Sequence, residues 1–176
     1  MLILAKIVAK ILSILNGEVS PRQIAAGFSI GVLIGLLPLG GLMSLFVIFG
    51  AFLINVNLAI MFVAAGIFKI IAYAIDPIAN QIGYQLLTQV PALTPFWTKL
   101  YNLPVVPYTK FNNTLVLGSL VLGIVLLIPA YFLAKKGIVQ YRTHLKQKVL
   151  DLKIMKMFQA SSIYQYYQSF KGIVGK

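Results

Sequence analysis

The stretch IAAGFSIGVLIGLLPLGGLMSLFVIFGAFLI, residues 24–54, contains no charged residue and is interrupted in its middle by Pro38, Gly40 and Gly41. The apolar run at 24–37 would form a helix about 21 Å long at 1.5 Å per residue, whereas the hydrocarbon core of a bilayer is about 30 Å thick. The run at 42–54 is shorter still. The stretch therefore predicts either a re-entrant hairpin of two half-helices or a single membrane crossing kinked at Pro38.

The composition indicates a membrane protein. Of the 176 residues, 60% are apolar and 10% are charged, against roughly 45 to 50% and 25% in soluble domains. A water-soluble fold of this size cannot hide so much apolar surface, whereas a helical protein in a bilayer has its outer faces covered by lipid. We therefore expect an all-α, polytopic helical membrane protein with discontinuous or re-entrant half-helices.

Three glycines recur at helical spacing in the first half-helix. Gly27, Gly31 and Gly35 are four residues apart, so they share one face of a helix and allow another backbone to approach closely. The pattern predicts a helix-packing surface.

A second interruption is predicted further along the chain. The apolar run 58–75 is long enough to cross a bilayer, but it ends at Asp76 and Pro77, which are suited to ending one helix and starting another over 77–90. Lys69 lies inside the run, where a charge costs roughly 2.5 to 3.5 kcal/mol at the bilayer centre. We expect Lys69 to reach the membrane surface, a lipid phosphate or Asp76.

The last part of the membrane domain has a loop and a clear crossing. The loop at 91–114 carries Trp97, Tyr101 and Tyr108, aromatic residues typical of the membrane boundary. Residues 115–134 then form a charge-free run of sufficient length to span the bilayer.

Basic segments flank the membrane domain, which is expected over 18–134. Residues 1–17 are predicted to form an N-terminal interfacial helix, and 135–176 a basic cytoplasmic tail with an amphipathic helix. By the positive-inside rule both termini are expected in the cytoplasm. The residues expected at the membrane surface are Lys6, Lys10, Lys135, Lys136, Arg142 and Lys146.

The chemistry available to the chain is limited. It has three acidic residues, one histidine and no cysteine, so we expect no catalytic residues, no metal site, no cofactor and no enzymatic activity. The formal charge of +12 suits anionic lipid headgroups better than nucleic acid, because the basic residues flank apolar spans.

Broken helices expose peptide groups at membrane depth, and transporters use such ends as binding sites. The residues expected to bind lipid or substrate lie at the two breaks, at the embedded lysine and at the start of the first half-helix: Arg22, Pro38, Gly40, Gly41, Lys69, Asp76 and Pro77.

Residues 20–90 resemble an uncharacterised bacterial membrane family, domain of unknown function 2062. The resemblance rests on the Pro21-Arg22 start, the three spaced glycines, the Pro38-to-Gly41 break and the Asn57-Leu58 step. Asp76-Pro77 departs from the pattern, since the family often has Asn-Pro there. The resemblance implies the bacterial inner membrane, and relatives of this longer form look like companions of large envelope proteins.

Two functions follow from these features. The first is a small inner-membrane protein that handles lipid or serves a lipid-transport assembly. The alternative is a non-transporting scaffold whose glycine face packs against a partner. A channel would need a polar pore lining, which the sequence lacks. The expected partners are membrane lipids with anionic headgroups, and another envelope membrane protein or a second copy of the chain.

Overall fold

The computed structural model describes residues 11 and 14–145. Every regular element in this part of the chain is helical, and the order is α2 (Pro21–Leu36), α3 (Leu42–Phe52), α4 (Leu58–Tyr84), α5 (Thr94–Tyr101) and α6 (Thr114–Gln140). A π-helical turn at Gln85–Gln89 follows α4, and short 3₁₀ turns flank α5. Most of the expected interfacial helix and basic tail, with Lys6, Lys10 and Lys146, lies outside the described residues.

The chain divides into two compact units. One is Pro21–Lys135, and the other combines Met1–Ser20 with Lys136–Lys176. The first unit contains the broken stretch and the two long helices, so it holds the candidate site.

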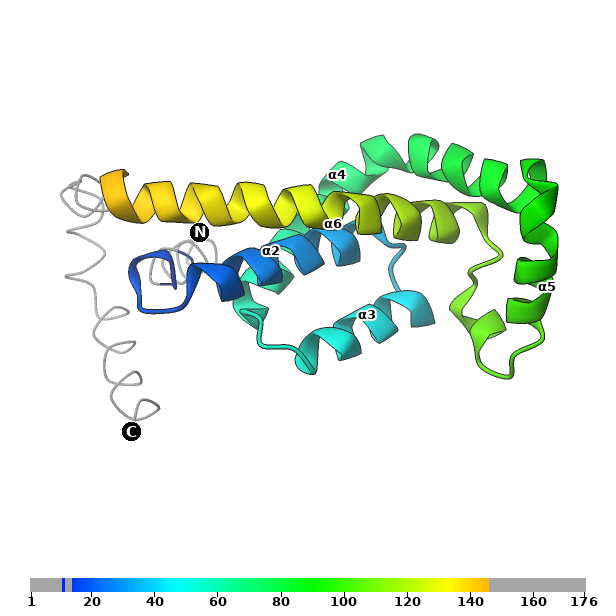
Figure 1. Cartoon of the computed structure of the whole chain (residues 1–176), viewed down its shortest axis with the longest axis horizontal. Coiled ribbons are helices and arrows are strands. Elements are labelled where there is room, and N and C mark those ends of the chain that lie inside the picture. The colour runs from blue at the N-terminus through cyan, green and yellow to red at the C-terminus, as the bar shows by residue number, and fades with distance from the viewer. Residues whose placement is uncertain (1–10, 12–13, 146–176) are drawn as a thin grey trace. The chain divides into compact units, whose positions relative to one another are not determined.

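Helix α2 is the core of the larger unit. Eleven of its sixteen residues are buried, including Ile24, Val32 and Leu36 at 2% exposure each. Ile30 and Ile34 pack with residues of α3, while Val32 and Leu36 pack with residues of α4 and α6. Figure 1 shows α2 lying between α6 and α3. A helix buried on all sides needs an apolar surface all round, which explains why the sequence of α2 carries no charge after Arg22.

Helices α2 and α4 run parallel and in close contact along the glycine face. Gly27 lies against Asn57, Gly31 against Met61 and Ala64, and Gly35 against Ala65, Phe68 and Lys69. A methyl group added to Gly35 would be 2.6 Å from Cβ of Phe68 and 2.7 Å from the carbonyl oxygen of Ala65. The three glycines therefore pack inside the unit and are not available as a surface for a partner protein.

Helix α3 folds back beside α2 as a hairpin. The turn between them contains Gly40 with a φ of 75°, a left-handed conformation that glycine adopts without strain. After α3 the chain returns to the start of α2, where the backbone N–H of Asn57 donates to the carbonyl of Gln23 at 3.0 Å. The Gln23 amide Nε2 donates to Oδ1 of Asn55 at 2.7 Å. The two half-helices thus form a hairpin in the structure and not a single helix kinked at Pro38.

Helix α6 runs antiparallel to both α2 and α4. Gly118 lies against Ala79 and Gly83 lies against Thr114, while Gly123 lies against Leu33 of α2. Helix α6 thus approaches α4 and α2 closely at three further glycines, which lie outside the glycine pattern of residues 24–37.

The expected break at Asp76 and Pro77 is wrong. Helix α4 continues through both residues to Tyr84, with Pro77 in its interior. Proline at this position removes the bond that an N–H would donate to the carbonyl of Tyr73, at a cost of about 3 kcal/mol. Buried contacts on both sides hold the helix together, because Ala72 packs in the cluster with Val32 and Leu36 and Ala79 packs against Gly118. The separate helices expected at 58–75 and 77–90 are therefore one element.

The expected loop at 91–114 contains a helix. The side-chain Nε1 of Trp97 in α5 donates to the carbonyl of Leu86 at 2.9 Å, and its ring lies 6.1 Å from that of Phe111. These contacts hold α5 against the start of the π-helical turn and against the residues before α6.

Replacing Asn57 by alanine is expected to lower the free energy of unfolding by about 1 kcal/mol, because the Asn57 side chain caps α4. Its Oδ1 accepts the backbone N–H of Ile60 at 3.0 Å. Denaturant titration of the purified protein in detergent measures the change. Asn112→Ala, at an exposed position, is the control, and equal stability of both variants would contradict the role of the cap.

Candidate functional site

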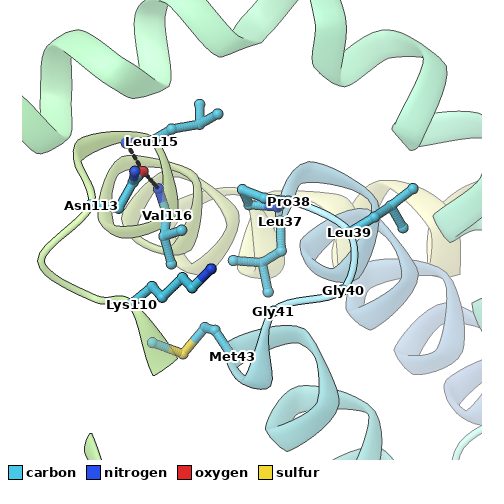
Figure 2. A pocket seen from close by; sticks show the side chains of 10 residues that line it. All are labelled: Leu37, Pro38, Leu39, Gly40, Gly41, Met43, Lys110, Asn113, Leu115 and Val116. Atoms are coloured by element: carbon cyan, nitrogen blue, oxygen red, sulfur yellow. Dashed lines mark hydrogen bonds between the residues drawn. The ribbon is translucent and has the colours of Figure 1, made fainter. Parts of the chain in front are cut away.

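The turn between α2 and α3 lines an open pocket of ≈ 250 Å³. One wall is the turn itself with Met43 of α3, and the opposite wall comes from the segment at the start of α6. The lining residues are Leu37, Pro38, Leu39, Gly40, Gly41, Met43, Lys110, Asn113, Leu115 and Val116. Figure 2 shows these two walls facing each other. The break in the charge-free stretch therefore lies beside a cavity.

Lys69 reaches the break from α4. Its ammonium Nζ donates to the carbonyl oxygen of Leu37 at 2.8 Å. This carbonyl belongs to the end of α2, where the last peptide oxygens have no partner within the helix and the helix dipole is negative. The embedded lysine thus acts as a cap of the half-helix. Its partner is a main-chain oxygen 32 positions away in sequence, not Asp76.

Two further carbonyls of the turn lie within hydrogen-bond distance of Ser44. The hydroxyl of Ser44 donates to the carbonyl of Gly41 at 2.8 Å and, more weakly, lies 3.5 Å from that of Pro38. Ser44 is buried at 8% exposure, so this contact is part of the hairpin core. Three hydrogen-bond acceptors at the break, the carbonyls of Leu37, Pro38 and Gly41, are therefore engaged from within the protein.

Lys110 reaches the pocket from the opposite wall. It is the one non-glycine residue in the described chain with a positive φ, at 58°. Figure 2 shows its side chain extending from the segment before α6 toward Leu37 and Gly41. Asparagine or glycine is more usual in this conformation, so a lysine here carries a conformational cost while placing a cation at the pocket.

Asn113 organises the same wall. Its side-chain Oδ1 accepts the backbone N–H groups of Leu115 at 3.0 Å and Val116 at 3.2 Å, which caps the start of α6. The two bonds are drawn in Figure 2. The cap fixes where α6 begins and hence the position of Leu115 and Val116 in the pocket wall.

The residues expected at the site are only partly brought together. Pro38, Gly40 and Gly41 line the pocket, and Lys69 binds its edge. Arg22 lies exposed in the first turn of α2, about 22 Å from Leu37 along the helix. Asp76 and Pro77 lie about 10 Å or more beyond Lys69 on α4. The site is therefore one pocket at one break.

Sequence reasoning did not place Lys110, Asn113 or Met43 at the site. Lys110 is one of two basic residues between 91 and 114, and nothing in its neighbours indicates contact with a turn seventy positions earlier. A lysine inside a charge-free span is unusual and therefore indicates a site, whereas a lysine in a loop is common and does not.

Of the residues expected at a membrane surface, Lys135 is half-buried and Lys136 is exposed, both in α6. Arg142 binds main-chain oxygens: its Nε donates to the carbonyl of Leu15 at 2.8 Å, and its Nη2 lies 3.3 Å from that of Ile14. Arg142 thus caps the helical residues before Asn16 within the smaller unit.

Within residues 11 and 14–145, no group of three or more histidine, cysteine, aspartate or glutamate side chains is placed to hold a metal ion. The groups that face the pocket are a lysine ammonium, an amide and apolar side chains. Such a set suits the binding of an oxyanion or an amphipathic molecule.

Comparison with known proteins gives a family and a relative. A family model described as an uncharacterised protein conserved in bacteria, domain of unknown function 2062, matches residues 5–147. An uncharacterised protein of Treponema pallidum (strain Nichols) is 27% identical over 135 residues, which cover 77% of this chain and 83% of that protein. No solved structure matches the chain. The family match extends well beyond residues 20–90, where the resemblance was expected.

Proposed function

Since the chain belongs to the bacterial family named domain of unknown function 2062, we propose that it is an integral membrane protein of the bacterial inner membrane that binds lipid at the tip of the α2–α3 hairpin. In this function the protein binds the lipid and does not change it chemically. It rests on one observation above all: the break at Pro38–Gly41 lines a pocket that also holds Lys110.

The outer surface of the larger unit supports membrane insertion. Two helical segments, Leu58–Gln89 and Thr114–His144, are long and apolar enough to cross a bilayer. Their outward side chains are apolar and well exposed, for example Ile70 at 74% and Val125 at 63%. Soluble monomers rarely expose continuous apolar patches beyond a few hundred Å², and lipid chains would cover these faces.

The hairpin supports a re-entrant arrangement. At 1.5 Å per residue α2 is about 24 Å long and α3 about 17 Å, both less than the hydrocarbon core. Because α3 returns to the start of α2, the hairpin would enter and leave the bilayer on one side. Helices α4 and α6 would then be the two full crossings, which gives an even number and keeps both termini in the cytoplasm.

The aromatic residues around α5 support the position of the opposite membrane boundary. Tyr101 and Tyr108 are exposed at 55% and 69%, and Trp97 is fixed by its bond to Leu86. Amphipathic rings of this kind favour the headgroup region. The boundary would thus lie at the ends of α4 and α6 that the loop 91–114 connects.

The position of the glycine face bears on the scaffold alternative. Gly27, Gly31 and Gly35 are covered by α4, so a partner cannot use them while the unit is folded. This favours lipid as the first ligand to test, since the open pocket remains available.

Filling the pocket is expected to weaken lipid binding at least tenfold. Gly41→Leu suits this test, because Gly41 has an ordinary extended backbone with φ −87° and a Cβ atom there would meet only the Pro38 carbonyl oxygen, at 3.9 Å. The chain has one tryptophan, Trp97, so energy transfer from Trp97 to a phosphatidylethanolamine with a dansyl group on its headgroup measures binding in detergent.

The matched control is Gly50→Leu, which adds the same side chain to α3 at a position with open space around it. The unmodified protein and this control should show the same saturable energy transfer. Equal affinity of Gly41→Leu and the unmodified protein would remove the pocket from the proposal.

A further inference from the structure

Positive charge lies in the pocket wall, at Lys110, and at the edge of the pocket, at Lys69. Lys69 binds the carbonyl of Leu37 at the edge of the turn, and Lys110 extends toward the same turn from the start of α6. Among the pocket-lining residues none is acidic. A molecule that enters this pocket therefore meets the ammonium group of Lys110 and no opposing carboxylate in the lining.

Several carbonyl groups at the turn already have hydrogen-bond donors. The carbonyls of Leu37, Pro38 and Gly41 are engaged by Lys69 and Ser44. Because these three acceptors are occupied and the ammonium group of Lys110 lies at the pocket, the complementary ligand is an acceptor with negative charge, such as a phosphate group.

A strip of exposed apolar side chains leads away from the pocket along α3. Leu42, next to the pocket residue Met43, is followed on the same helical face by Leu45, Phe46 and Phe49, and these side chains are 38%, 57%, 51% and 67% exposed. Residues at i, i+3, i+4 and i+7 form one continuous strip. An acyl chain can lie on such a strip, which a free phosphate ion would not use.

The pocket lies at the end of α6 that is remote from its basic residues. It contacts Leu115 and Val116, whereas Lys135 is twenty residues later on the same helix, about 30 Å away. This separation equals the thickness of a hydrocarbon core. On the proposed topology, the pocket faces the leaflet on the non-cytoplasmic side.

We infer that the pocket selects a phospholipid with net negative charge from the non-cytoplasmic leaflet, with its phosphate between Lys110 and the turn at 38–41 and an acyl chain along α3. This inference rests on the proposed lipid-binding function and adds the class of lipid, the leaflet and the residue that selects it. Lys110 is the selecting residue, because the ammonium of Lys69 is already engaged by Leu37.

Competition in detergent tests the inference. The dansyl-labelled lipid is displaced with short-chain phosphatidylglycerol, short-chain phosphatidylcholine or inorganic phosphate. In the unmodified protein phosphatidylglycerol should displace the probe at concentrations at least tenfold lower than phosphatidylcholine, and inorganic phosphate should fail at those concentrations. Lys110→Asn removes the charge and suits the positive φ, so the tenfold preference should fall below about threefold.

Two further variants complete the test. Lys110→Arg should retain the preference, because it keeps the charge, and Lys99→Asn should also retain it, since Lys99 lies in α5 outside the pocket lining. An unchanged preference in Lys110→Asn would overturn the inference while leaving lipid binding intact. Displacement by inorganic phosphate as effectively as by phosphatidylglycerol would overturn the assignment to a lipid.

The leaflet is tested separately in liposomes. With the protein inserted in one orientation, as checked by protease access to the basic tail, addition of short-chain phosphatidylglycerol to the side opposite the tail should displace the probe. Displacement only from the side of the tail would overturn the leaflet assignment.

Discussion

Gly118→Ala is expected to lower the free energy of unfolding by about 3 kcal/mol, the upper part of the usual range for overpacking a tight contact. A methyl group at this position would overlap the carbonyl of Ala79 in α4 and would lie 2.9 Å from the backbone nitrogen of Gly83. Backbone atoms cannot move aside as a flexible side chain can, so α4 and α6 must separate. Denaturant titration in detergent, followed by helical circular dichroism, measures the loss.

Gly66→Ala is the matched control and should raise the free energy of unfolding. Gly66 lies on α4 with no atom near its missing side chain, so alanine there gains helix propensity worth up to about 1 kcal/mol. If both variants were stabilised, α4 and α6 would not be in backbone contact at Gly118.

Lys69→Met should increase the rate at which a cysteine at position 37 reacts with a thiol reagent by at least about tenfold. Methionine keeps the length of the side chain but leaves the Leu37 carbonyl without its partner at 2.8 Å, and a hydrogen bond to a charged group contributes about 1.5 to 3 kcal/mol. Since 1.4 kcal/mol corresponds to a factor of ten, the end of α2 should open more often. Leu37 is 1% exposed, and the natural chain has no cysteine.

The control for this experiment is Lys99→Met, which removes a lysine from α5 and leaves the end of α2 untouched. In this variant the cysteine at position 37 should react at the same rate as in the Leu37→Cys protein that keeps both lysines. Equal rates in all three proteins would mean that the lysine does not hold the half-helix in place.

Most of the helical elements could be predicted from local pattern. The start of α2 at Pro21, the break at Pro38 and the start of α4 after Asn57 all follow from the chemistry of caps and turns. The spacing of Gly27, Gly31 and Gly35 indicates a close helix contact, and the structure places α4 on that face. These features depend only on neighbouring residues, so they can be read from the sequence.

The same local reasoning failed at Pro77. An Asp-Pro pair favours a helix boundary when neighbours alone are considered, but the contacts of Ala72 and Ala79 with other helices outweigh that preference. Of the two expected breaks, only the one at Pro38 is therefore present, and three of its carbonyls, those of Leu37, Pro38 and Gly41, have partners within the protein.

The sequence by itself determined the helical class, the charge-free core helix and the position of its interruption, because these depend on composition and on spacing within one or two turns. The tertiary structure alone decided that the stretch folds as a hairpin, that Lys69 binds the Leu37 carbonyl and that Lys110 meets the same turn. Those contacts join residues from 32 to more than 70 positions apart, and only the packing of α2 against α3, α4 and α6 brings them together.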